Sequence, residues 1–513
     1  MKYYRLLISA CVVLPVFSLS LHRRQTETFV SDGNPILSDG SIYSADPAPF
    51  VVNNTVYILS GRDEALPTTN AFIMNEWQLF SAENPDPAGG EWTLQRAVAR
   101  PEVLFAWADS GGAYASQIIQ GADGRFYFFA SVTQRDPGTQ DAFGIGVAVS
   151  DSPMGPFTDA HPDGPIISQA VPVRNDMHNI DPVVLVDDDN RVFVYWGSFN
   201  QLRGVELGSD MTTIIGSITA VTTLTGFFEA PWFMKRKETY YMLYAANNAG
   251  PDSPCTPTSY HACIAYGTAS SPLGPWTFRG VVLPIVSSTT SHPGVYALAD
   301  GAHFLVYHTA DAEGGGHFRR SIALDPLLFD DATNPPSIRP VERSVRPALS
   351  APRPPSRNVA PLAEPSSDPR TPVQYWLAAL HDERVPSTPL PPDYWSAWAG
   401  EASPRESVLT YTWNATVELN GVAVAFFADA PAGADFGVAP PREWRVEYRA
   451  ADGAWKDVAA EGPFPNEVTD SPAEVGFATV KTTMLRAVFV GSGNGPYAAV
   501  GIKEWFAFAP TPV

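Results

Sequence analysis

One pattern recurs five times between residues 46 and 308: a short apolar run, a polar turn and an aromatic-rich run. Turns such as Ala-Asp-Gly between two apolar runs are typical of β-hairpins. The copies begin at Asp46, Ala115, Asp181, Glu229 and His292. Five small antiparallel sheets in succession predict an all-β fold, a five-bladed β-propeller, which we assign to residues 27–345. An array of β-sandwiches without radial symmetry is the alternative.

Equivalent positions of this repeat should form a ring, because the innermost strand of each propeller blade runs along the central channel. Asp46, Asp181 and Glu229 occupy such positions, so we expect three carboxylates at one mouth of the channel. Carboxylates are rarely gathered inside a fold without a function. The alternative is that each Asp-Pro or Glu-Ala-Pro sequence only marks the start of a strand.

Paired carboxyl groups facing each other across a pocket can hydrolyse a glycosidic bond. One protonates the leaving oxygen, while the other activates water or attacks the sugar. A third carboxylate nearby raises the pKa of the acid by like-charge repulsion. The sequence lacks the Gly-x-Ser-x-Gly elbow of serine hydrolases and the His-Glu-x-x-His motif of zinc hydrolases.

The composition of the chain changes after the last repeat. Residues 346–372 are rich in Pro, Ser and Ala, which predicts a linker or a packed connection. Alternating strand patterns resume over residues 373–513 and predict a β-sandwich domain. Near its end, Trp505 follows a glycine-rich loop. Either Trp505 lies in the sandwich core, or it reaches the rim of the substrate cleft and stacks on a sugar.

Residues 1–20 have the features of a signal peptide: Lys2 and Arg5, an apolar run, then small residues. We therefore expect a secreted, extracellular protein. The alternative is that these residues form a buried N-terminal helix.

Two further features of the sequence, a cysteine pair and two glycosylation sequons, are expected to be modified only in an exported protein. Cys255 and Cys263 remain once the leader is removed, and their short spacing predicts a local disulfide. Asn53 and Asn414 begin N-glycosylation sequons.

The formal net charge of −21 excludes several kinds of partner. So acidic a surface repels nucleic acid and anionic membranes. Apolar residues make up 45% of the chain and charged residues only 17%, which indicates a folded globular protein, expected to be a monomer.

Three segments resemble the signatures of glycoside hydrolase family 43: residues 44–49 (Ser-Ala-Asp-Pro-Ala-Pro), 179–182 (Asn-Ile-Asp-Pro) and 228–232 (Phe-Glu-Ala-Pro-Trp). The resemblance covers residues 30 to 345. It implies an inverting, exo-acting enzyme that requires no cofactor for catalysis. Asp46 would be the general base, Glu229 the general acid, and Asp181 the residue that orients the acid and adjusts its pKa.

The long form with a C-terminal sandwich resembles fungal α-L-arabinofuranosidases that remove side chains from arabinoxylan. A β-xylosidase acting on xylo-oligosaccharides is the alternative enzyme. A carbohydrate-binding protein without catalysis is the alternative from another class.

The resemblance also suggests supporting residues. His292 occupies the fifth ring position, where some family members hold an axial calcium ion; a hydrogen-bonded His without metal is the alternative. One of Arg319 and Arg320 should reach the sugar, because neighbouring residues of a strand point to opposite faces, and we prefer Arg319. Trp107 and Tyr114 precede the second inner strand and either stack on the sugar or pack in the core.

Overall fold

The computed structural model describes residues 26–83, 85–247, 255, 262–286, 290–344, 358–372, 374–400, 402–429, 437–492 and 499–510. The expected signal peptide at residues 1–20 lies outside these ranges and stays a prediction. In the described part of the chain, no helix has the length and apolar character needed to span a membrane.

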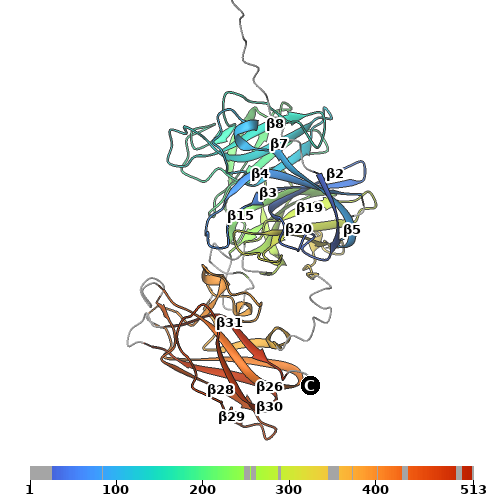
Figure 1. Cartoon of the computed structure of the whole chain (residues 1–513). Coiled ribbons are helices and arrows are strands. Elements are labelled where there is room, and N and C mark those ends of the chain that lie inside the picture. Colours follow the sequence, from blue (N-terminus) through green and yellow to red (C-terminus); the bar gives the residue numbers. More distant parts are fainter. Residues whose placement is uncertain are drawn as a thin grey trace, which may run out of the picture.

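The predicted five-bladed β-propeller and the sandwich domain that follows it are confirmed (Figure 1). The first blade contains β1 (Thr26–Asp32), β2 (Tyr43–Val52), β3 (Thr55–Asp63), β4 (Met74–Ala82) and β5 (Ala88–Ala99), and the short helix α1 (Pro101–Leu104) follows it. The second contains β6 (Ser116–Gln120), β7 (Phe126–Thr133), β8 (Phe143–Ser150), β9 (Thr158–Asp159) and β10 (Ile167–Ser168). The third contains β11 (Val183–Val186), β12 (Val192–Trp196), β13 (Leu202–Leu207) and β14 (Ile214–Val221).

The last two blades complete the ring. The fourth contains β15 (Phe227–Arg236), β16 (Thr239–Ala246), β17 (Cys263–Ala269) and β18 (Thr277–Leu283). The fifth contains β19 (Gly294–Ala297), β20 (His303–Thr309) and β21 (Ser321–Pro326), and the small hairpin of β22 (Phe329–Asp330) and β23 (Ser337–Ile338) follows it. We call the end of the propeller at which β2, β6, β11, β15 and β19 begin the carboxylate end.

The N-terminal segment closes the ring by pairing with the fifth blade. The Ile36 amide donates to the Ile322 carbonyl at 2.9 Å. The Asn34 side chain donates to the Leu324 carbonyl and accepts from its amide, at 2.8 and 3.0 Å. These bonds join segments nearly 300 residues apart, and so fix the first blade, which carries Asp46, against the last.

The C-terminal domain is a separate β structure with its own buried core. Its strands are β24 (Glu364–Asp368), β25 (Trp395–Ser396), β26 (Glu406–Phe427), β27 (Val438–Ala439), β28 (Glu443–Arg449), β29 (Trp455–Asp457), β30 (Ala473–Val490) and β31 (Ala499–Phe508). Short 3-10 helices occur at η1 (Ala360–Leu362), η2 (Leu377–Leu380) and η3 (Pro391–Asp393). The two long strands β26 and β30 pair with each other along most of their length.

The linker predicted at residues 346–372 needs a correction in its second half. Residues 364–368 form β24, which pairs with residues 408–412 of β26. The Asn358 side chain also accepts a hydrogen bond from the Ala507 amide. The Pro- and Ser-rich composition hid this strand because β24 lies at a sheet edge, where missing amide donors cost little.

Trp505 lies in the sandwich core, so the interpretation that placed it at the rim of the substrate cleft is wrong. Its side chain is fully buried. Its ring stacks on Tyr411 with centroids 4.1 Å apart and an interplanar angle of 13°. The alternation of β31 turns Trp505 inward and leaves the neighbouring Phe506 partly exposed.

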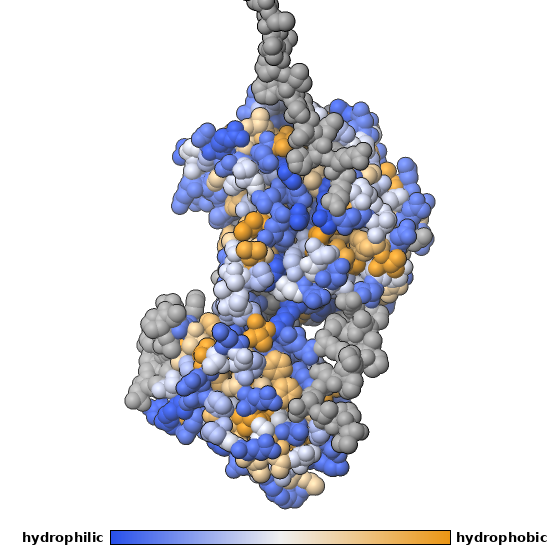
Figure 2. Space-filling model, in the orientation of Figure 1, coloured by the Kyte–Doolittle hydropathy of each residue, from blue (hydrophilic) through white to orange (hydrophobic). Residues whose placement is uncertain are grey.

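The two domains meet at a constriction (Figure 2). The Asn70 side chain, in the loop after β3, donates to the Thr388 carbonyl at 3.0 Å. Arg384 forms an ion pair with Asp311, in the loop after β20, at 3.7 Å. Both propeller loops lie at the carboxylate end, so the C-terminal domain contacts the rim of that end.

Candidate active site

Three inner strands carry the same backbone feature at the carboxylate end. Asp46, Asp181 and Ala230 each have a positive φ, of 54°, 58° and 56°, and each precedes a proline. A residue with a side chain adopts this conformation only when its surroundings enforce it. Here the amide of each is bonded to a side chain of the preceding blade in the ring: His308, Ser131 and Asp181 respectively. The strained turns therefore join neighbouring blades and aim the carboxylates at the axis.

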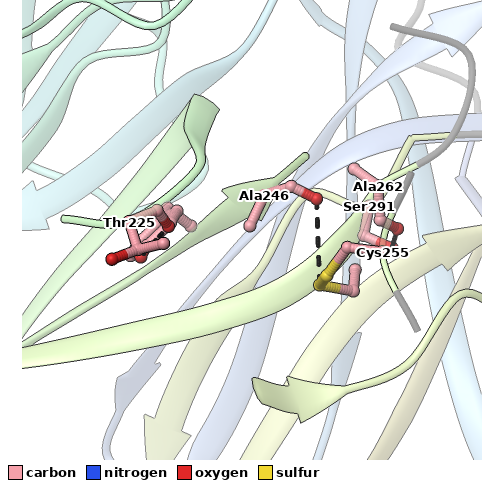
Figure 3. Close-up of a disulfide and its surroundings, with 7 residues drawn as sticks. Thr225, Ala246, Cys255, Ala262 and Ser291 are labelled. Carbon is pink, nitrogen blue, oxygen red and sulfur yellow. Dashed lines mark hydrogen bonds between the residues drawn. A yellow bond between two sulfur atoms is a disulfide. The ribbon is translucent and has the colours of Figure 1, made fainter. Parts of the chain in front are cut away.

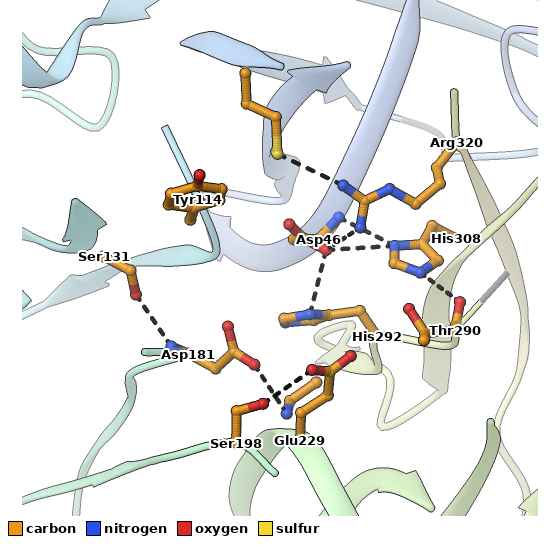
Figure 4. Close-up of polar contacts among 12 residues, drawn as sticks. Asp46, Tyr114, Ser131, Asp181, Ser198, Glu229, Thr290, His292, His308 and Arg320 are labelled. Carbon is orange, nitrogen blue, oxygen red and sulfur yellow. Dashed lines mark hydrogen bonds and ion pairs between the residues drawn. The ribbon is translucent and has the colours of Figure 1, made fainter. Parts of the chain in front are cut away.

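Asp46 is surrounded by cationic and polar groups (Figure 4). Its Oδ1 accepts from Nη1 of Arg320 at 2.9 Å and lies 3.4 Å from Nδ1 of His292. Burial alone would raise the pKa of Asp46, but the Arg320 guanidinium and the His292 ring outweigh it and hold this pKa well below its usual range. Asp46 is thus kept as a carboxylate.

His308 supports Asp46 as a neutral ring. Its Nδ1 accepts the Asp46 amide at 3.2 Å, and its Nε2 donates to the Thr290 carbonyl. Complete burial, and then the charge of Arg320, hold the pKa of His308 well below its usual range. The contact with Asp46 is therefore a hydrogen bond from a backbone amide and not an ion pair.

Glu229 has the opposite electrostatic environment from Asp46. Burial and the negative charge of Asp181 raise the pKa of Glu229 to about 8. Its Oε2 accepts from the Ser198 hydroxyl at 3.0 Å. At neutral pH Glu229 therefore carries a proton that it can donate.

The pKa of Asp181 lies between those of Asp46 and Glu229. Burial is the largest influence on this pKa, which rises to about 6. Its Oδ2 accepts the Ala230 amide at 3.1 Å, next to Glu229 in the chain. Asp181 is therefore ionised over the range in which Glu229 is still protonated.

His292 lies among the three carboxylates, as Figure 4 shows. Burial lowers the pKa of His292, but its contacts with Asp46 and the charges of Asp181 and Glu229 raise it overall. Calcium prefers oxygen ligands, whereas His292 offers a nitrogen, and the Asp46 oxygen beside it is held by the Arg320 guanidinium. These two donors do not by themselves form a calcium site, and the axial calcium ion near His292 stays a prediction. In the described ranges, no group of three or more His, Cys, Asp and Glu could hold a metal ion.

The preference for Arg319 over Arg320 is wrong, although only one of the two points inward, as predicted. Arg320 lies in the site and binds Asp63 through Nε and Nη2, at 2.8 and 2.9 Å, as well as Asp46. Arg319 points outward and donates to the carbonyls of Gly314 and Leu66.

Trp107 and Tyr114 differ in position. Trp107 packs against Phe105 with ring centroids 5.0 Å apart, and its ring fills the space beside Gly146. This position matches the packing alternative. Tyr114 faces the site, near Asp46 (Figure 4), with its ring partly exposed.

The predicted disulfide between Cys255 and Cys263 is present (Figure 3). Beside it, the Ser291 hydroxyl donates to the Ala262 carbonyl, close to the segment that carries His292. Asn53, in the turn between β2 and β3, and Asn414, in β26, are both exposed.

An ionised carboxylate and a protonated carboxyl group are the pair that a glycoside hydrolase requires, and here a third carboxylate raises the pKa of the second. The model of glycosyl hydrolases family 43 matches residues 33–334, well over half of the chain. The protein belongs to this family.

Three relatives illustrate its range. An arabinoxylan arabinofuranohydrolase of Bacillus subtilis (strain 168) is 29% identical over 49% of this chain and 52% of its own length. A β-D-galactofuranosidase of Aspergillus niger is 26% identical over 65% of this chain and 94% of its own length. A xylosidase/arabinosidase of Bacteroides ovatus is 27% identical over 56% of this chain and 92% of its own length. The chain thus matches about half the length of the Bacillus subtilis relative.

Solved structures of family 43 enzymes are also similar. One is an enzyme from Xanthomonas citri in complex with xylose, with 24% identity over 59% of this chain and 91% of that chain and a TM-score of 0.47.

Sequence reasoning missed several residues that shape the site: Asp63, Ser131, Ser198 and His308. Asp63 ends β3 and Ser131 lies in β7, while Ser198 follows β12 and His308 lies in β20. All four lie on or just after the strand that follows the inner strand of a blade, namely β3, β7, β12 or β20, where that strand returns to the carboxylate end. A search for polar residues at the ends of these strands would have found them.

Proposed function

We propose that the protein is a secreted, inverting exo-glycosidase that removes α-L-arabinofuranosyl side chains from arabinoxylan. The observation that carries the hydrolytic part of this proposal is the placement of Asp46 and Glu229 in opposite electrostatic environments. The former is held ionised by Arg320, and the latter is held protonated by burial and Asp181.

In this mechanism Glu229 protonates the oxygen that leaves with the xylan chain. Asp46 orients the attacking water and accepts its proton. A carboxylate with so low a pKa is a weak base, so it takes the proton only as the water becomes acidic on bonding to the anomeric carbon. Asp181 orients Glu229 through the Ala230 amide and maintains its pKa.

The substrate assignment draws on the Bacillus subtilis relative, which is an arabinoxylan arabinofuranohydrolase. The Bacteroides ovatus relative, a xylosidase/arabinosidase, makes a β-xylosidase the second candidate. The perturbed carboxyl groups count against a carbohydrate-binding protein without catalysis, which would not need them.

Secretion rests on the N-terminal leader pattern and on the disulfide, which forms in oxidising compartments. The exposed sequons at Asn53 and Asn414 are consistent with glycosylation during export. We expect a monomer.

Product analysis tests the substrate. The protein should release arabinose from wheat arabinoxylan and little xylose from xylo-oligosaccharides. Xylose as the main product would establish the second candidate, and no sugar from either substrate would contradict both.

A further inference from the structure

Five aromatic rings form a continuous row beside the carboxylates, which we call the aromatic arc: Tyr114, Phe143, His178, Phe199 and Phe228. Successive ring centroids lie 5.4, 5.8, 4.9 and 5.4 Å apart. The sequence analysis considered only the first of these residues.

The arc follows the carboxylate end across three blades. Tyr114 precedes β6, and Phe143 begins β8. His178 precedes β11, Phe199 follows β12, and Phe228 lies in β15. Each of these positions is at the end of its strand where the inner strands begin. The rings therefore share one rim of the propeller with Asp181 and Glu229.

Phe199 is the most exposed ring of the arc, with 52% of its surface accessible. Its φ of 48° lies in the left-handed region, and so does that of Asn200, at 68°. A large apolar side chain that is both exposed and strained gains little for folding. Such a cost points to a function for the ring.

The backbone around Phe199 ties it to the general acid. The preceding residue, Ser198, donates its hydroxyl to Glu229 at 3.0 Å. The following residue, Asn200, donates its amide to the Phe228 carbonyl at 3.1 Å. Phe199 is thus held beside Glu229, on the side where the leaving group departs, because the acid must face the leaving oxygen.

His178 fixes the middle of the arc. Its ring packs between those of Phe143 and Phe199. Its Nδ1 pairs with the Asp141 carboxylate, which restricts rotation of the ring. The ring of His178 is therefore held in a fixed orientation against Phe199, the most exposed ring of the arc.

We propose that the aromatic arc binds the β-1,4-xylan main chain, with Phe199 stacking on the xylose unit that carries the scissile arabinosyl group. The apolar faces of pyranose rings pack on aromatic rings, while their hydroxyl groups bond elsewhere. This assignment rests on the proposed function, since it takes the main chain as the leaving group. Phe199 is a residue for substrate specificity and not for the chemical step.

The first experiment measures binding alone. In the inactive Asp46→Asn protein, calorimetry with xylohexaose should give a Kd about tenfold weaker when Phe199→Ala is added, the loss of about one aromatic stacking contact. Phe199→Tyr should retain the affinity. Leu328→Ala removes a side chain of similar exposure (56%) beyond the far end of β21 and should leave the affinity unchanged.

The second experiment separates a role in recognition from a role in folding. Phe199→Gly removes the ring and also relieves the positive φ, so its melting temperature should equal or exceed that of the wild type. Its kcat/KM should fall several-fold more on arabinoxylan than on methyl α-L-arabinofuranoside, which has no main chain. A lower melting temperature, or equal losses on the two substrates, would overturn the assignment.

The two proposals fail separately. If the wild type releases no arabinose, the proposed function is wrong whatever xylohexaose does. If it releases arabinose but xylohexaose binds the inactive protein equally well with and without the Phe199→Ala substitution, only the arc proposal is wrong.

Discussion

Nη1 of Arg320 donates to Oδ1 of Asp46 at 2.9 Å, and Nε and Nη2 of the same guanidinium group donate to the carboxylate of Asp63. Arg320 and Asp63 are both buried. One cation therefore holds Asp46, the proposed general base, and is itself held by a second carboxylate. Because Arg320 directly follows Arg319, the chain provides its own control for testing this arrangement.

Arg320→Gln should lower kcat at least about tenfold on every glycoside, since Asp46 loses its fixed orientation and the charge that keeps it ionised. Its acidic pH limb should also move to higher pH, because the pKa of Asp46 rises once the guanidinium is gone. Arg319→Gln, on the outward side, should change neither quantity. Steady-state kinetics with an aryl arabinofuranoside across the pH range compare the two variants, and equal losses in both would contradict the role assigned to Arg320.

Glu229→Gln should make activity depend on the leaving group. Glycosides of acidic phenols need little protonation and should keep much of their turnover, whereas arabinoxylan should lose nearly all of it. Asp46→Asn should lose both, because neither substrate then has a group to activate water. A comparison of kcat across a series of substituted phenyl glycosides measures this; a flat dependence in Glu229→Gln would exclude it as the general acid.

The alkaline limb of kcat/KM should fall near pH 8, where Glu229 loses its proton. Asp181→Asn removes the negative charge that raises the pKa of Glu229, so its limb should move to lower pH. Ser198→Ala removes a hydrogen bond that stabilises the ionised form, so its limb should move to higher pH. Shifts of the same sign in the two variants would show that another group controls this limb.

The first sugar released should have the opposite anomeric configuration to that in the substrate, because Asp46 is expected to activate water rather than attack the sugar. Proton NMR during the first turnovers detects the product before mutarotation. Retained configuration would require a covalent intermediate and would contradict the role of Asp46.

The sequence located the carboxylate ring because the repeat and its prolines mark where each inner strand begins, and the structure places Asp46, Asp181 and Glu229 together there. It could not choose between Arg319 and Arg320, because strand alternation shows that one of two neighbours points inward but not which one. The contact with Asp63, which ends β3, decides that choice. The arc was missed for a similar reason: its rings come from loops and strand ends of three different blades and share no motif, and only the closed propeller brings them together.

Trp505→Ala should destabilise the C-terminal domain by about 3–5 kcal/mol, the usual cost of removing a large buried aromatic side chain. The ring is fully buried against Tyr411, whose hydroxyl bonds the carbonyls of Leu380 and Trp505, so its loss leaves a cavity that this bonded framework cannot easily close. Phe506→Ala, one residue along on the partly exposed face, should cost much less. Urea unfolding followed by fluorescence and circular dichroism measures both variants. If Trp505→Ala left stability intact and instead raised KM for arabinoxylan, the tryptophan would belong to a binding surface and its place in the core would be contradicted.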